Sequence, residues 1–75
     1  MLEESMRVVF RGRLRAARKM RGLTQQRLGQ RIGLPHSSIS HFERGTRSPA
    51  LRTFINLALS LNVSTDYLLG IGDDL

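Results

Sequence analysis

Apolar residues recur along the chain with the three- and four-residue spacing of amphipathic helices. In the first such segment, turning successive side chains by about 100° places four apolar residues on one face, namely Met6, Phe10, Leu14 and Ala17. A later segment predicts a core stripe on a helix ending near Asn62, namely Leu51, Phe54, Ile55, Ala58 and Leu61. With only two prolines and few β-branched residues, the chain fits a compact all-α bundle better than a sheet protein.

Between these segments, residues 24–43, TQQRLGQRIGLPHSSISHFE, predict two short helices joined by a tight turn. Gln25 opens the first helix, Gly29 removes a side chain where the second helix must approach closely, and Gly33 ends the first helix in the left-handed conformation. The apolar sides of the two helices carry Leu28, Ile32, Leu34, Ile39 and Phe42. This arrangement is typical of a helix-turn-helix unit.

The rest of the chain predicts two more helices. Gly45 and Pro49 mark a loop, with Ser48 as the cap of a fourth helix and Pro49 at its first position. Ser64 caps a fifth helix, in which Asp66 favours the helix dipole. Five helices therefore account for a single domain over residues 1–75 with its core at about 7–70, and we expect residues 1–5 and 71–75 to be flexible.

The second helix of the turn unit has one polar and one apolar side. With His36 at zero, Ser40, Arg44, Ser37 and His41 fall between about 40° and 140°, whereas Phe42 and Ile39 fall at about 240° and 300°. An ordinary solvated face is the alternative interpretation, but such faces are usually rich in Glu and Lys. Short donors and acceptors suit a helix that lies in the major groove.

Charge supports a polyanionic partner. The formal net charge is +6, and nine basic residues but no acidic residue lie between Met6 and Phe42. Nucleic acid is the expected polyanion. A membrane surface is the alternative, but the apolar face of the first helix is needed for the core. The sequence shows no signal peptide or membrane-spanning segment, so we expect a cytoplasmic protein without a membrane partner.

Catalytic and metal chemistry find no support in the sequence. Cysteine is absent, which excludes disulfides and thiolate metal sites. His36 and His41 are about 140° apart around their helix and do not converge on one ion. The acidic residues form no paired site, and the glycines form no phosphate loop. We therefore expect neither an enzyme nor a bound metal or cofactor.

Four motifs together resemble the lambda-repressor and Cro type of helix-turn-helix domain found in bacterial and phage regulators. They are RxxRGLTQ at 18–25, the pair Gly29 and Gly33, FERGxRxP at 42–49 and NVSTDYLLG at 62–70. The resemblance runs from about Phe10 to Gly70. It implies a five-helix domain that binds an operator in double-stranded DNA, usually as a two-fold homodimer, and that represses or activates transcription without catalysis.

The resemblance also implies roles for particular residues. The base-reading set is His36, Ser37, Ser40 and His41, and the phosphate-binding set is Gln25, Arg44, Thr46 and Arg47. The alternative role of Gln25 is to cap a helix. The alternative role of Thr46 is to form a hydrogen bond through its hydroxyl within its own turn. Arg18 is expected to pair with Glu43 and so to join the first helix to the third. Pro35 departs from the family pattern, because Ser or Thr commonly caps the reading helix there.

Two questions stay open at this point. An antitoxin-like module that binds a protein partner is the alternative function, although it has no need of the exposed polar face with Arg44 and Arg47. The second question concerns the apolar residues near the C-terminus, which either cover the end of the fourth helix or meet a second copy, namely Tyr67, Leu68, Leu69 and Ile71.

Overall fold

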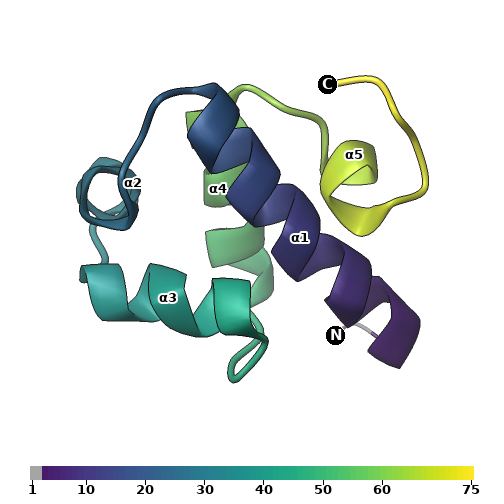
Figure 1. The fold of residues 1–75 in the computed structure, drawn as a ribbon, viewed down its shortest axis with the longest axis horizontal. Coiled ribbons are helices and arrows are strands. Elements are labelled where there is room, and N and C mark those ends of the chain that lie inside the picture. The colour runs from purple at the N-terminus through teal and green to yellow at the C-terminus, as the bar shows by residue number, and fades with distance from the viewer. Residues whose placement is uncertain (1–2) are drawn as a thin grey trace.

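The computed structural model describes residues 3–75, and these residues form five helices and no strand. The helices are α1 (Glu4–Met20), α2 (Gln25–Ile32), α3 (His36–Arg44), α4 (Leu51–Leu61) and α5 (Thr65–Leu69). Helix α1 runs diagonally across the front of the molecule, α2 and α3 lie to one side of it, α5 lies to the other, and α4 lies behind it (Figure 1). The expected all-α, five-helix fold is thus confirmed. No helix within residues 3–75 combines the length and apolar character needed to cross a bilayer.

Each helix contributes at least one buried side chain to a single core. From α1 these are Phe10, Leu14 and Ala17, as the apolar spacing predicts, with Met6 partly buried against them. The rings of Phe10 and Phe54 lie 5.7 Å apart between centroids and join α1 to α4. Leu28, Ile39, Phe42 and Leu68 complete the contributions of α2, α3 and α5. Burial of these side chains is the main stabilising contribution in a chain without disulfides.

The predicted core stripe of α4 is wrong at two positions. Leu51 and Ile55 are 60% and 39% exposed, and Leu57, which the stripe omitted, is fully buried. Relative to Phe54, Leu57 lies at about −60° around the helix and Ile55 at about +100°. The face that meets the core is therefore turned toward Leu57. This rotation leaves Leu51, Ile55 and Leu59 on the surface.

The expected start of α4 is also wrong. The N-cap is Ala50, without any side-chain hydrogen bond, and the first helical residue is Leu51. Pro49 is buried and precedes the helix, so its ring packs inside the molecule instead of occupying the first helical turn. At the other end α4 stops where expected, because Asn62 adopts the left-handed conformation at φ 53°.

The turn between α2 and α3 explains both of its glycines. Gly33 has φ 74° and its N–H bonds to the carbonyl of Gly29, which ends α2. A Cβ built on Gly29 would lie 2.4 Å from the carbonyl oxygen of Leu34. The close approach at Gly29 thus comes from the backbone of the turn, not from a side chain of α3. Both residues are needed for the sharp change of direction between the two helices.

Both ends of the described chain lie against the helices. Helix α1 begins at Glu4, within residues 1–5, for which flexibility is expected; residues 1–2 of that segment lie outside the described residues. Arg13 of α1 donates hydrogen bonds to the carbonyl of Tyr67 within α5 and to the carbonyl of Gly72 beyond it, at 3.2 and 3.1 Å. The Ser64 hydroxyl donates to the carbonyl of Asp74 at 2.9 Å, and it also caps α5, as predicted, by accepting from the N–H of Tyr67.

Candidate nucleic-acid interface

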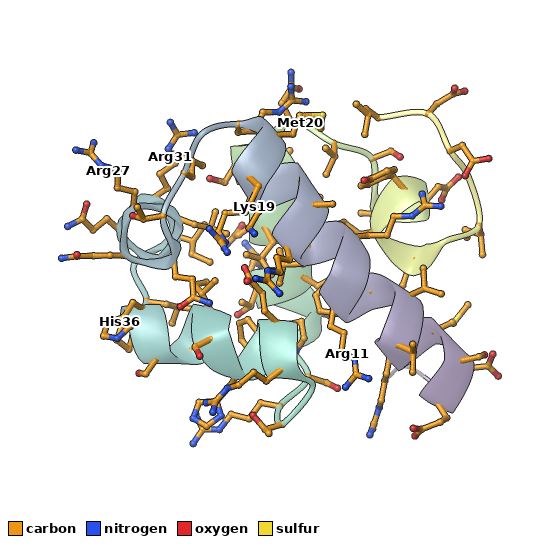
Figure 2. All side chains as sticks on the ribbon, viewed as in Figure 1. Arg11, Lys19, Met20, Arg27, Arg31 and His36 are labelled. Carbon is orange, nitrogen blue, oxygen red and sulfur yellow. The ribbon has the colours of Figure 1, made fainter. Side chains whose placement is uncertain are left out.

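Helix α3 presents the polar face that its sequence predicts. Ile39 and Phe42 are buried in the core, whereas His36 and Ser37 are exposed and Ser40 and His41 are half-buried. His36 lies at the end of α3 that adjoins α2 (Figure 2). A helix held on its apolar side by the core offers its opposite side for contact with another molecule. The four candidate base-reading residues therefore lie on the outer side of one helix.

Pro35 is the N-cap of α3 and makes no side-chain hydrogen bond. Its φ of −67° and ψ of 155° are extended, so α3 begins one residue later, at His36. The Pro35 carbonyl still accepts the N–H of Ser38 at 3.0 Å. The first turn thus forms without the Ser or Thr cap of the family pattern, and His36 becomes the first helical residue.

His41 and Thr46 form a local hydrogen-bonded cluster at the C-terminal end of α3. The Nδ1 atom of His41 lies 2.6 Å from the Thr46 hydroxyl oxygen. The backbone N–H groups of Thr46 and Arg47 both point to the carbonyl of His41, at 3.0 and 3.4 Å. The Thr46 hydroxyl is therefore occupied within its own turn, which corresponds to the alternative interpretation of that residue.

Gln25 does not cap α2. Thr24 is the N-cap, and its hydroxyl accepts the N–H of Arg27 at 3.0 Å. The side-chain amide of Gln25 donates instead to Glu43 at 3.3 Å. An amide nitrogen carries two hydrogens, so this bond leaves one donor of Gln25 for a further acceptor.

Arg18 and Glu43 form the expected ion pair between α1 and α3. Two nitrogens of Arg18 donate to the two carboxylate oxygens of Glu43, at 2.6 and 3.0 Å, and a third donates to the carbonyl of Leu23 at 2.8 Å. The side chains of Arg18 and Glu43 are only 10% and 4% exposed. The hydrogen bond with Glu43 raises the pKa of Arg18 above its usual value, although burial acts in the opposite direction. The pair fixes α3 at a set position on α1.

The loop after α3 carries two exposed arginines, Arg44 and Arg47. Arg11 of α1 donates to the carbonyl of Arg44 at 3.1 Å, which ties the loop to α1. A Cβ on Gly45 would lie 2.5 Å from the same Arg11 side chain, and Gly45 has φ 77°. The loop is thus held on one side by α1 and on the other by the carbonyl of His41.

Several basic residues that the sequence alone shows only as a source of positive charge donate hydrogen bonds to particular backbone carbonyls. Arg21 donates to the carbonyls of Leu61 and Asn62, at 2.7 and 3.0 Å, and Arg31 donates to the carbonyl of Ser60 at 3.3 Å. These carbonyls end α4, which has no basic residue in its own last turn. Cations at the negative end of a helix are stabilising. Sequence reasoning missed this role because the partners lie about 30 to 40 residues apart in the chain.

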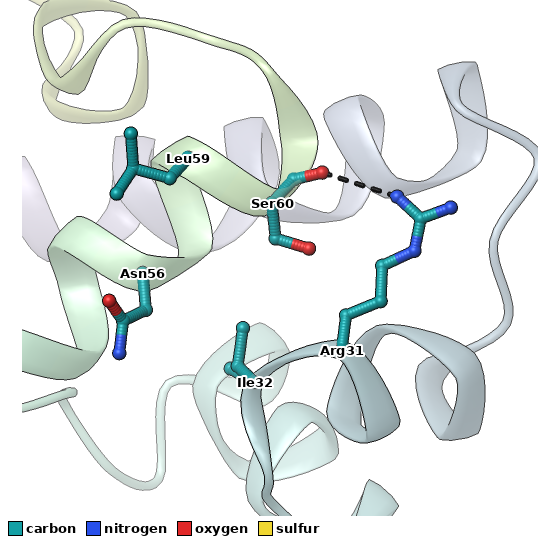
Figure 3. Close-up of a pocket in the computed structure, with 5 residues that line it drawn as sticks. All are labelled: Arg31, Ile32, Asn56, Leu59 and Ser60. Atoms are coloured by element: carbon teal, nitrogen blue, oxygen red, sulfur yellow. Dashed lines mark hydrogen bonds between the residues drawn. The ribbon is translucent and has the colours of Figure 1, made fainter.

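Arg31 also borders a shallow depression of about 620 Å³ between α2 and α4 (Figure 3). The other lining residues are Ile32, Asn56, Leu59 and Ser60. Arg27 and Arg31 project from α2 away from α3, whereas Arg11 lies on the side of the loop (Figure 2). The depression is therefore distinct from the polar face of α3.

Comparison with known proteins agrees with this geometry. A helix-turn-helix family model matches residues 14–68. The HTH-type transcriptional regulator ImmR of Bacillus subtilis is 40% identical over 58 residues, which cover 77% of this chain and 46% of ImmR. The HTH-type transcriptional regulator YqaE of the same organism is 38% identical over 61 residues, which cover 81% of this chain and 53% of YqaE. The chain thus spans about half the length of these two relatives.

Among solved structures, the P22 c2 repressor in complex with a synthetic operator matches with a TM-score of 0.80 at 33% identity. The match covers 85% of this chain and 97% of the repressor chain. Both the order of the helices and the position of the turn unit agree with the resemblance drawn from the sequence motifs. The chain belongs to the helix-turn-helix family, in its lambda-repressor and Cro type.

Proposed function

We propose that this chain binds double-stranded DNA in a sequence-specific manner and represses transcription, with α3 lying in the major groove. The observation that carries the proposal is the division of α3 into a buried side, Ile39 and Phe42, and an outer side made of short polar residues. The matched P22 c2 repressor was solved in complex with an operator, which supports the same activity here. The chain acts through binding, not catalysis, and in the cytoplasm.

Base reading falls to the outer side of α3, that is to His36, Ser37, Ser40 and His41. Their imidazole and hydroxyl groups match the donors and acceptors on base edges in the major groove. The phosphate contacts fall to Arg44 and Arg47, which are exposed at the end of α3, and to the free donor of Gln25 at the start of α2. Phosphate contacts at both ends of the turn unit set the register in which α3 meets the bases.

Selection from a random pool of duplexes tests this proposal directly. The protein is incubated with the pool at fixed salt, the bound duplexes are recovered and sequenced, and the size of the complex is measured. We expect enrichment of one sequence motif, which the protein binds at least about 1,000-fold more tightly than random DNA. Recovery of duplexes without any shared motif would contradict sequence-specific binding.

The proposal includes a homodimer that forms through α4. Leu51, Ile55 and Leu59 are 60%, 39% and 73% exposed, and their spacing of four residues places them in an apolar stripe along one side of α4. Contiguous apolar surface of this kind is typical of an interaction site. Leu59 also lines the depression between α2 and α4, which offers a recess beside the stripe.

The direction of α4 favours a second copy as the occupant of the stripe. Helix α4 rises behind α1 from the level of α3, which lies along the lower edge of the molecule (Figure 1). A two-fold axis parallel to α4 pairs the two stripes and leaves both α3 helices on the same side of the dimer. Two such helices spaced about 34 Å apart meet successive major grooves on one face of the duplex.

A further inference from the structure

The side chain of His41 has one hydrogen-bond partner among the described residues, the hydroxyl of Thr46. Its Nδ1 lies 2.6 Å from that oxygen, which also lies 3.3 Å from the carbonyl oxygen of His41. The hydroxyl has one proton, so it can donate to the ring or to the carbonyl but not fully to both. The choice decides which nitrogen of the His41 ring carries hydrogen, because the bond at one ring nitrogen sets the state of the other.

The carbonyl of His41 already has its full set of donors. It accepts the N–H of Gly45, the N–H of Thr46 at 3.0 Å and the N–H of Arg47 at 3.4 Å. A carbonyl oxygen has two lone pairs, and the amides of Thr46 and Arg47 already engage both, while the N–H of Gly45 is shared with the carbonyl of Phe42. The hydroxyl at 3.3 Å is therefore at most a weak additional donor to this carbonyl. The ring nitrogen is also the nearer acceptor, at 2.6 Å against 3.3 Å. The proton of the Thr46 hydroxyl therefore points to Nδ1.

We propose that Thr46 is a positioning residue that fixes the tautomer of His41, so that the Nε2 atom of His41 is always a hydrogen-bond donor. In the neutral ring, Nδ1 accepts from Thr46 and Nε2 carries the hydrogen. In the charged ring, both nitrogens carry hydrogen, Nδ1 donates to the Thr46 oxygen, and Nε2 remains a donor. Both protonation states thus present the same group.

A donor at Nε2 restricts which base His41 can read. Guanine presents two acceptors in the major groove, O6 and N7, whereas cytosine presents only an amino donor there. His41 therefore favours guanine over cytosine at the position it contacts, whereas adenine N7 and thymine O4 remain acceptable partners for the same donor. This specificity rests on the proposed function, but the tautomer is a property of the free protein and can be measured without DNA.

The first experiment measures the tautomer of His41 in the free protein. Long-range ¹H–¹⁵N correlation spectra of the histidine rings are recorded on the wild type, Thr46→Ser and Thr46→Val, at a pH where the rings are neutral. We expect the Nε2–H form for wild type and Thr46→Ser, and a mixture of tautomers for Thr46→Val. His36 has no contact with Thr46 among the described residues and is the internal control, with an unchanged ring signature in all three proteins. An Nδ1–H form of His41 in the wild type would overturn the inference.

The second experiment measures base preference at the operator position that loses contact in His41→Ala. We expect wild type and Thr46→Ser to favour guanine over cytosine about tenfold, the effect of one hydrogen bond made or lost. Thr46→Val should reduce this ratio toward one, while His41→Ala abolishes it. A preference for cytosine in the wild type, or an unchanged ratio in Thr46→Val, would overturn the inference and leave sequence-specific binding intact. Absence of any DNA binding would instead contradict the proposed function.

Discussion

Arg18 and Glu43 lie 25 residues apart in the sequence and meet through two hydrogen bonds of 2.6 and 3.0 Å that join α1 to α3. Glu43 also accepts a hydrogen bond from Gln25, at the start of α2. One carboxylate on α3 therefore contacts both of the helices that hold α3 in position, α1 and α2. The position of α3 therefore depends on a charged pair that is almost wholly removed from water.

Glu43→Ala should destabilise the protein by about 3 to 5 kcal/mol, because it leaves the buried charge of Arg18 without its partner. Urea unfolding measures the change in the free energy of unfolding. Asp73→Ala is the matched control, since it removes an ion pair at the surface, between Arg13 and the 95% exposed side chain of Asp73. That change should cost about 0 to 1 kcal/mol. Equal effects of the two substitutions would show that burial of the Arg18 pair has no energetic consequence.

Gly29→Val should be strongly destabilising, because its Cβ would meet the carbonyl oxygen of Leu34 at 2.4 Å. Gly12→Val is the control: it makes the same chemical change in another helix, where a Cβ meets nothing within 4 Å. We expect Gly29→Val to cost at least about 2 kcal/mol more than Gly12→Val in the same unfolding measurement. Similar costs would mean that the turn between α2 and α3 yields to accommodate a side chain.

Arg44→Ala and Arg47→Ala should each weaken binding to the selected operator and to random DNA by the same factor. Each phosphate contact that is lost should also flatten the slope of log affinity against log salt by about one. Arg27→Ala removes the same charge from the part of α2 that projects away from α3, so it should leave the slope almost unchanged (Figure 2). A change in base preference with either loop variant would contradict their assignment to phosphate contacts.

Ser37→Ala should relax the preference at one base pair by about 1 to 3 kcal/mol and leave binding to random DNA unchanged. Ser38→Ala is the matched control, because it removes the same hydroxyl from the next residue of α3, which is half-buried. Both are compared by titration with the operator and with a set of single-base variants. If Ser38→Ala relaxed the preference and Ser37→Ala did not, α3 would meet DNA through a different face.

Leu59→Glu should convert the proposed dimer to a monomer and lower operator affinity, since it places a charge in the apolar stripe of α4. Ile71→Glu is the control at another exposed apolar residue, 61% exposed beyond α5. Sedimentation equilibrium of both variants measures the change. A dimer that persists in Leu59→Glu and dissociates in Ile71→Glu would move the interface to the C-terminal segment.

The sequence predicted those features of the fold that depend on neighbouring residues. The buried face of α1, the left-handed Gly33 and the Ser64 cap all rest on contacts within about one or two helical turns, and each is present. The start of α4 could not be read in this way. Ser48 and Pro49 carry a strong local signal, but Pro49 is buried ahead of the helix, the N-cap is Ala50 and the first helical residue is Leu51.

In the candidate site, too, local spacing predicted features that depend on neighbouring residues, but not those that depend on distant residues. Helical spacing was sufficient to place His36 and Ser37 on the outer side of α3, because one turn of helix fixes both directions. The contacts of Arg21 and Arg31 with the end of α4 join residues distant in sequence, and no local pattern indicates them. The hydrogen bond between His41 and Thr46 is local, yet the sequence predicted that Thr46 contacts phosphate. Sequence alone does not reveal which neighbouring group a hydroxyl faces.

The path of the last residues has a practical consequence for assays. The chain after α5 runs along the side of the molecule remote from α3, and its end lies near the top of the view while α3 lies at the bottom (Figure 1). A fluorophore or surface tether attached to Leu75 would stand clear of a bound duplex. Anisotropy and immobilised-protein measurements can therefore use that attachment point without obstructing the recognition surface.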